Sequence, residues 1–309
     1  MKKIVLSQTC QGEILKQLLA LSQPFQEEYT CHFVPNYEIK NGKAATAAVP
    51  TALEAELPDC DVLVYHAITL YDFDRLIALM PPGSQAFRIP YVTSTIYWPS
   101  LDFQNPCWLG PRQSTALIPW PCRVLNELIV RRREKQRVIQ DYLETDLAAS
   151  FDLSTHFSNQ VTYLEQAEAG TIFHIADRVQ REFASVQLFH MINHPSVVMF
   201  LDIADALLET LGFPKLPPYS YDPFCMHQMP IHPSVIRHYK LTWCGPDTRW
   251  VILDKKFDFE EYTAYYIDAY IEKFGYAQMP TQARSCKVHF LQALRQRWRC
   301  GPFRRLKKS

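Results

Sequence analysis

Residues 3–21 read KIVLSQTCQGEILKQLLAL, and this stretch decides the fold. Its first part, Lys3–Leu6, is a short apolar run with β-branched residues, which is typical of a buried strand. The polar Ser7–Gly12 is typical of a turn, and the apolar residues of Glu13–Leu21 recur at helical spacing. The sequence therefore predicts that the chain begins with a strand, a tight turn and a helix.

Further apolar runs extend this pattern along the chain. Tyr29–Val34 and Asp61–Tyr65 are predicted as strands, and Gln85–Thr95 contains a fourth run at 88–92. From about residue 120 onward the apolar spacing is helical. Strands that alternate with helices favour a parallel sheet. We therefore predict an α/β fold, in which an N-terminal parallel α/β layer with an SGNH- or flavodoxin-like strand–turn–helix start is joined to a predominantly α-helical remainder.

The chain is predicted to have three parts. Residues 1–120 form an α/β domain that carries the Cys-Gln-Gly turn, and residues 121–215 form a helical region with an Asn-His-Pro block. Residues 216–309 comprise a Pro/Tyr-rich loop and a basic C-terminal helical extension. Helices of the second and third parts are expected at Cys122–Leu143, Ser158–Glu182, Ser196–Leu211, Phe257–Gly275 and Ala283–Trp298.

The composition excludes several classes of protein. Hydrophobic residues make up 48% of the 309 and charged residues 21%, which is enough apolar surface for a core. The nine glycines form no phosphate-binding loop motif, and the nine cysteines show no C-x-x-C spacing, so no metal is expected. No apolar run reaches the roughly 18 residues of a membrane-spanning helix. The N-terminus turns polar by Ser7, too early for a signal peptide, so we expect a cytoplasmic protein.

The charges are distributed unevenly along the chain. The net charge is zero, but ten of the 32 Lys and Arg residues follow Glu272, the last acidic residue, so residues 1–272 carry 22 basic against 32 acidic side chains. Aromatic and basic residues alternate in the tail, which suits an anionic membrane surface or an acidic partner. Equally, the tail helix could pack its apolar face on the body. The acidic body argues against a nucleic acid partner.

Polar residues that follow the predicted strands are the first candidates for a site, because ligands of parallel α/β layers gather beyond the carboxyl ends of the strands. Cys10, His66 and Thr93–Pro99 have this position. Cys10 also precedes a helix, whose free N–H groups favour a thiolate or an anion, and Gly12 would let a ligand approach the backbone. The alternatives are a cysteine that packs under the helix and a histidine that is hydrogen-bonded for structural reasons.

Asn193 and His194 form a second candidate group. They lie directly before Pro195, which suits the first turn of a helix. Their side chains are expected either to cap that helix or to face a ligand.

Three consecutive arginines give one predicted helix a positive charge. Such residues either form a solvated face or bind phosphate groups. They are Arg131, Arg132 and Arg133.

Three blocks together resemble the WcbI family of capsular polysaccharide biosynthesis proteins. These blocks are the opening strand with Cys10-Gln11-Gly12, the stretch Tyr163–Asp177, and Leu188–Pro195 with its Asn-His-Pro ending. The resemblance covers residues 1–215. It implies an α/β part joined to a mostly helical remainder, coenzyme A binding, and acetyl transfer to a sugar hydroxyl of a capsule precursor. Thr9, where relatives often have Asn, and His66, where we expect Gln or a similar residue, depart from the family pattern.

The resemblance also implies roles for the matching residues. O-acetylation needs a base for the sugar proton and hydrogen-bond donors for the oxyanion. His194 is predicted as the base, or His66 if His194 is structural, and Asn193 with the backbone N–H groups of Gln11 and Gly12 as the oxyanion donors. Cys10 either carries the acyl group or lines the pantetheine end of CoA, and we favour the second role. The candidates for binding the phosphates of CoA are Arg88, Arg131, Arg132 and Arg133.

Two other functions use the same features. An esterase or thioesterase would place water where the acetyltransferase places the sugar. A non-catalytic scaffold would bind CoA or a glycan within a capsule assembly complex. For the transferase and the scaffold, the basic tail is expected to contact capsule-assembly proteins or the inner face of the cytoplasmic membrane.

Overall fold

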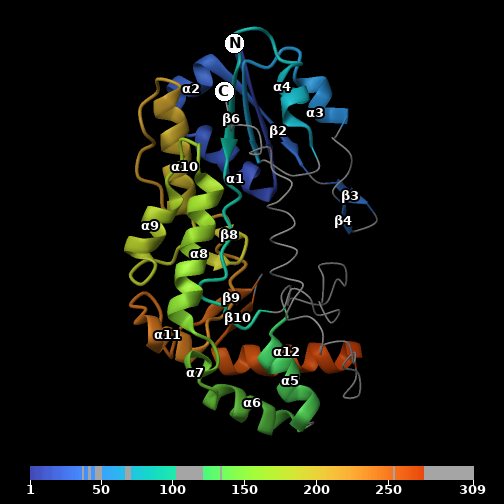
Figure 1. Cartoon of the computed structure of the whole chain (residues 1–309), viewed down its shortest axis with the longest axis vertical. Coiled ribbons are helices and arrows are strands. Elements are labelled where there is room, and N and C mark those ends of the chain that lie inside the picture. Colours follow the sequence, from blue (N-terminus) through green and yellow to red (C-terminus); the bar gives the residue numbers. More distant parts are fainter. Residues whose placement is uncertain are drawn as a thin grey trace, which may run out of the picture.

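A computed structural model of the chain describes residues 1–36, 38–40, 43–45, 51–66, 71–101, 121–132, 134–252 and 255–274 (Figure 1). The N-terminal elements are β1 (Lys2–Gln8), α1 (Cys10–Leu19), α2 (Gln23–Glu28), β2 (Tyr29–Pro35), β3 (Glu38–Lys40), β4 (Lys43–Ala45), α3 (Thr51–Glu56), β5 (Val62–His66), α4 (Phe73–Ile77) and β6 (Gln85–Ile89). The remaining elements are α5 (Arg123–Arg132), α6 (Lys135–Glu144), α7 (Leu147–Ser150), α8 (Leu153–Glu168), α9 (Ile175–Glu182), β7 (Phe189–Met191), β8 (His194–Pro195), α10 (Val197–Thr210), α11 (Pro233–Tyr239), β9 (Trp250–Ile252), β10 (Lys255–Phe257) and α12 (Phe259–Phe274).

The central feature is a parallel sheet of four strands in the order β2-β1-β5-β6. β1 is an interior strand of this sheet, and its residues Ile4, Val5 and Leu6 are completely buried, as the apolar opening run predicts. Ile4 and Leu6 pack toward α1 and α10, and Val5 packs toward α3 and α4 on the other face. Figure 1 shows these helices on the two sides of the sheet. The predicted α/β layer with its helical remainder is confirmed.

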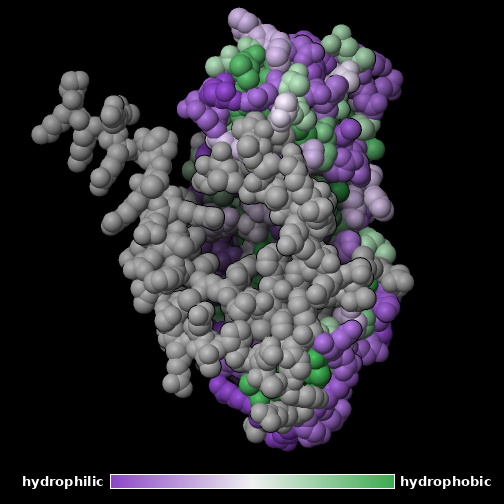
Figure 2. Space-filling model, turned by 90° about the vertical axis from the view of Figure 1, so that its right-hand side faces the viewer, coloured by the Kyte–Doolittle hydropathy of each residue, from purple (hydrophilic) through white to green (hydrophobic). Residues whose placement is uncertain are grey.

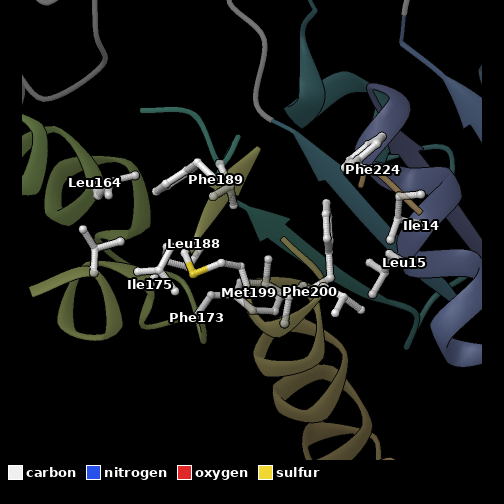
Figure 3. Close-up of a cluster of buried hydrophobic side chains, with 14 of the residues drawn as sticks. Ile14, Leu15, Leu164, Phe173, Ile175, Leu188, Phe189, Met199, Phe200 and Phe224 are labelled. Atoms are coloured by element: carbon white, nitrogen blue, oxygen red, sulfur yellow. The ribbon is translucent and has the colours of Figure 1, made fainter. Parts of the chain in front are cut away.

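The main hydrophobic core joins the sheet to the helices that follow it. It extends from Ile4 in β1 to Trp250 in β9. Figure 3 shows part of it, with Ile14 and Leu15 of α1 on one side and Leu164 of α8 on the other. This core contains residues of all three predicted parts, and the boundaries near 120 and 215 stay a prediction.

A second cluster of buried side chains holds α5, α6 and α12 together. Ile129, Ile139 and Ile267 lie at its centre, each at most 3% exposed. Figure 1 places these three helices at the end of the long axis away from the sheet. The expected helix at 257–275 is thus observed as α12.

Several element boundaries differ from the sequence-based predictions. The first helix begins at Cys10, not at Glu13, because Thr9 serves as its N-cap. β6 ends at Ile89, before Pro90, which has no N–H for the ladder. The predicted helix 158–182 is two helices, α8 and α9, and Gly170 between them has a φ of +73°. The basic helix expected at 283–298 lies outside the described residues.

The visible surface of the described residues is mostly hydrophilic, with isolated hydrophobic side chains (Figure 2). Within the described ranges, no helix combines the length and apolar character needed to cross a bilayer.

Candidate functional site

Cys10 occupies the first position of α1, directly beyond the carboxyl end of β1. Thr9 caps the helix: its Oγ1 accepts from the Gln11 N–H at 3.4 Å, and its carbonyl accepts from the Gly12 N–H at 2.9 Å. Burial raises the pKa of the Cys10 thiol, while hydrogen bonds from the Thr9 side chain and from the N–H groups of Cys10 and Gln11 oppose that shift. The thiol is therefore held at a helix N-terminus, but it stays protonated at neutral pH.

The Gln11 side chain connects three segments that are distant in sequence. Its Nε2 donates to the carbonyl oxygens of Val92 at 2.7 Å and Asn193 at 3.0 Å, and its Oε1 accepts from the Val92 N–H at 3.2 Å. Gln11 is only 1% exposed. The structure thus brings together the first strand–helix corner, the segment after β6 and the Asn-His-Pro block. The positions after strands suggested this for the first two only.

Gly12 permits close packing within the protein. A Cβ at this position would lie 2.6 Å from the Phe33 ring and 2.8 Å from Cβ of Gln8. Any side chain here would therefore push α1 away from β1 and β2. Close packing against β1 and β2 therefore explains why this position is a glycine. A contact between Gly12 and a cofactor stays a prediction.

His66 ends β5 and is almost completely enclosed. Its Nδ1 accepts the Thr9 N–H at 3.3 Å, and its ring contacts Tyr91 edge-on at a centroid distance of 5.4 Å. Burial lowers the pKa of His66 to about 3, so the ring is neutral at physiological pH. Because Nδ1 accepts a hydrogen bond, the single ring proton lies on Nε2.

Tyr91 is a residue of this site that sequence reasoning missed. Burial, with a smaller contribution from the nearby Cys10, raises the pKa of its phenol to about 12, and a hydrogen bond with the Asn193 side chain opposes the shift. The Oδ1 atom of Asn193 is buried and has no partner among the described residues. Cys10 and Asn193 therefore both lie near the Tyr91 phenol. The available signal was Pro90, which ends β6 and leaves Tyr91 at the carboxyl edge of the sheet.

His194 lies in β8, next to Asn193, and contacts the loop that precedes α11. Its ring stacks on Phe224 at 4.0 Å with an interplanar angle of 5°, and His227 lies 5.9 Å away. Burial, with smaller contributions from His227 and His190, lowers the pKa of His194 to about 4. The side chain is therefore neutral, its Nδ1 has no hydrogen-bond partner among the described residues, and its basicity in this state is low.

The Asn-His-Pro block does not cap α10 in the way that Pro195 suggested. The helix begins at Val197, and the side chain that accepts the Val197 N–H, at 2.8 Å, is Asp222 of the Pro/Tyr-rich loop. The same carboxylate oxygen lies 2.7 Å from Nε2 of His190. Asp222 thus fixes the β7–β8 hairpin against α10, a role that no local pattern indicated.

The predicted phosphate-binding arginines lie apart from one another. The Arg88 guanidinium donates to the carbonyl of Ala169, after α8. Arg131 is exposed on α5 and pairs with Glu127 at 3.4 Å. Figure 1 places α5 away from the sheet and from α1. Arg132 belongs to α5, but its side chain lies outside the described residues, as does Arg133.

A pocket lies between the main hydrophobic core and the cluster of α5, α6 and α12. Its lining is mainly aromatic and includes Tyr97, Trp98, Tyr142 and Tyr266. At its edge, the Cys122 Sγ lies 3.3 Å from the Tyr142 hydroxyl. The parts of the chain that the structure describes contain no group of His, Cys, Asp and Glu side chains that could hold a metal ion.

Comparison with known proteins identifies the family. A family model described as the polysaccharide biosynthesis enzyme WcbI matches residues 3–216. The chain belongs to the WcbI family. Its members are described as polysaccharide biosynthesis enzymes, which agrees with the resemblance carried by Cys10-Gln11-Gly12 and the Asn-His-Pro block.

A solved structure of a WcbI protein shares the fold of this family member. The two align with a TM-score of 0.72 over 88% of this chain and 90% of the other, at 19% sequence identity. That protein is described as a novel polysaccharide biosynthesis enzyme, in a native form without the disulfide bond between CoA and one of its cysteines. A search of curated proteins finds no match to the chain.

Proposed function

We propose that this WcbI-family chain is a CoA-dependent O-acetyltransferase that acts on a capsular or surface polysaccharide or its sugar precursor. The observation that carries the proposal is the position of the Cys10 thiol at the start of α1, beside Tyr91 and Asn193. The description of the related WcbI structure supports it, because a disulfide between CoA and a protein cysteine requires the thiol end of CoA to reach that cysteine. In this chain Cys10 is the candidate for that position.

Direct transfer fits the properties of Cys10 better than a covalent intermediate. Its pKa is raised by burial, and no histidine forms a hydrogen bond with its thiol among the described residues. A cysteine nucleophile usually has a lowered pKa or an adjacent base. We therefore assign Cys10 to the wall around the pantetheine end of CoA.

In the proposed reaction, the sugar hydroxyl oxygen attacks the thioester carbonyl and gives its proton to a base. The tetrahedral intermediate then collapses, and CoA leaves as a thiolate that takes up a proton. His194 remains the proposed base because it is neutral and its Nδ1 has no partner among the described residues. His66 is less suitable, since its Nδ1 lone pair already accepts the Thr9 N–H.

The alternatives keep the same site and differ in the acceptor. Incubation of the full chain with acetyl-CoA, with and without capsule-type sugars, distinguishes them. Release of CoA that depends on the sugar supports transfer, whereas equal release without sugar indicates a hydrolase. Tight CoA binding without any release would indicate a scaffold and would contradict the proposed reaction.

A further inference from the structure

Among the described residues at the carboxyl edge of the sheet, buried side-chain donors without an acceptor occur at Gln8, His66 and Asn36. Gln8 ends β1 and is 1% exposed, and His66 ends β5 and is 2% exposed. The Nε2 atoms of both residues have no partner among the described residues. A buried donor without a partner destabilises the folded state, so each such group in a folded protein needs an explanation.

The register of the sheet places the Gln8 and His66 side chains next to each other. β1 and β5 are parallel neighbours in which Leu6 pairs with Val64 and Ser7 with Tyr65. Continuing that register puts Gln8 beside His66. Both have the same parity as Leu6 and Val64, which pack toward α1, so both side chains lie on the α1 face.

Both orphaned atoms are donors in the neutral protein. Nδ1 of His66 accepts the Thr9 N–H, which leaves the ring proton on Nε2, and Nε2 of Gln8 is an amide nitrogen. The low pKa of His66 keeps this arrangement unchanged across the physiological range. Thr9 connects the pair to Cys10 at the start of α1, because it directly precedes Cys10 and caps this helix.

The backbone donors that the sequence suggested for an oxyanion are already in use. The Gly12 N–H donates to the Thr9 carbonyl at 2.9 Å, and the Gln11 N–H lies 3.4 Å from the Thr9 Oγ1. The side-chain amide of Gln11 is bonded to Val92 and Asn193. The Asn193 side chain, the third predicted donor, is hydrogen-bonded to Tyr91. Gln8 and His66 carry other donors near Cys10, which have no partner among the described residues.

From this geometry we propose that Nε2–H of His66 and Nε2 of Gln8 form a donor pair that binds the carbonyl oxygen of the acyl thioester. The inference rests on the proposed function and deepens it, since it assigns the acyl oxygen to a specific pair of side chains. No proton is transferred in this role. The two donors stabilise the negative charge that develops on the oxygen when the sugar hydroxyl attacks.

The test compares the binding of acetyl-CoA with that of S-ethyl-CoA, a thioether that lacks only the acyl oxygen. Calorimetry gives the ratio of the two dissociation constants for the full chain and for His66→Leu, His66→Gln, Gln8→Leu and the control Tyr65→Phe. Tyr65 lies on the same strand with its side chain on the opposite face. A neutral hydrogen bond changes affinity by about two- to tenfold.

We expect the parent chain and Tyr65→Phe to bind acetyl-CoA several-fold more tightly than the thioether. His66→Leu and Gln8→Leu should each reduce this preference, and His66→Gln should retain it because glutamine keeps a donor. A preference that is unchanged in both leucine variants overturns the inference. An equal loss of affinity for acetyl-CoA and the thioether also overturns the inference. It would mean that the pair binds an amide oxygen of the pantetheine arm, which both ligands share, or binds no ligand oxygen.

These results are separate from those that test the proposed function. If acetyl-CoA shows no sugar-dependent release in the parent chain, the transferase proposal fails even when the binding preference exists. If release occurs but the preference does not depend on Gln8 and His66, only the donor pair is wrong.

Discussion

Replacing Gln11 with leucine tests whether one buried amide holds the site together. The change removes two hydrogen bonds donated to Val92 and Asn193 and one accepted from Val92; the two with Val92 are buried and the one with Asn193 is part-buried. Each such bond contributes about 1 kcal/mol, and the N–H and carbonyl groups of Val92 left behind remain buried without partners. The expected loss in the free energy of unfolding is therefore at least about 3 kcal/mol, a large part of the total of about 5–15 kcal/mol.

The measurement is equilibrium unfolding in urea, with the slope m compared between variants to confirm that the same surface unfolds. Gln17→Leu is the matched control, because Gln17 lies on the same helix and is exposed. We expect this control to change the free energy by less than about 0.5 kcal/mol. If Gln11→Leu and Gln17→Leu are equally stable, the three bonds do not join the segments, and the argument for a common site fails with them.

Four further predictions concern the same molecule. Cys10→Ala should retain sugar-dependent CoA release, because direct transfer needs no covalent acyl-cysteine; complete loss of release with normal CoA binding would favour the covalent route. Gly12→Ala should lower the free energy of unfolding by about 1–3 kcal/mol, since the added Cβ has no room; an unchanged urea midpoint would contradict this packing. The free energy of unfolding should fall as the pH is lowered from about 6.5 toward 4, because the unfolded chain binds protons at histidines whose folded pKa is depressed. The slope of the free energy of unfolding against pH reports the number of protons bound on unfolding. Replacing one of these histidines with Gln should lower that number by about one, and an unchanged slope would refute the assignment. These histidines are His66, His194 and His232. Removal of residues 284–309 should abolish binding to anionic vesicles in a flotation assay, and neutral vesicles serve as the control; undiminished binding would exclude the tail as the membrane contact.

The parallel sheet could be predicted from sequence because its strands are short apolar runs that are buried on both faces. Val5 and Val64 face opposite sides of the sheet, and both are completely buried. When helices cover both sides of a sheet, its strands need continuous rather than alternating apolar residues. The start of α1 was placed three residues too late, because Cys10-Gln11-Gly12 reads as a polar turn. The signal for the correct start was Thr9, a favoured N-cap residue.

The contacts that assemble the site could not be predicted from local patterns. Gln11 reaches Val92 and Asn193, which are 81 and 182 residues away along the chain, and no periodicity encodes such pairs. Asp222 was assigned to a loop, yet it supplies the carboxylate for the first N–H of α10. The sequence indicated which segments end at the sheet edge, and tertiary packing decided which side chains meet there.

The burial of the two site histidines separates the roles they can have. Nδ1 of His66 accepts a hydrogen bond from the Thr9 N–H, so the neutral ring can only donate through Nε2. His194 has a buried Nδ1 without a partner among the described residues, and it lies in the same hairpin as Asn193, whose carbonyl Gln11 holds beside α1. A donor on one element and a neutral acceptor on another are the two functions that acyl transfer to a hydroxyl requires. Because the low pKa of His194 makes it a weak base in the unliganded protein, a substrate that forms a hydrogen bond or brings a negative charge near its ring would raise that pKa and increase its basicity.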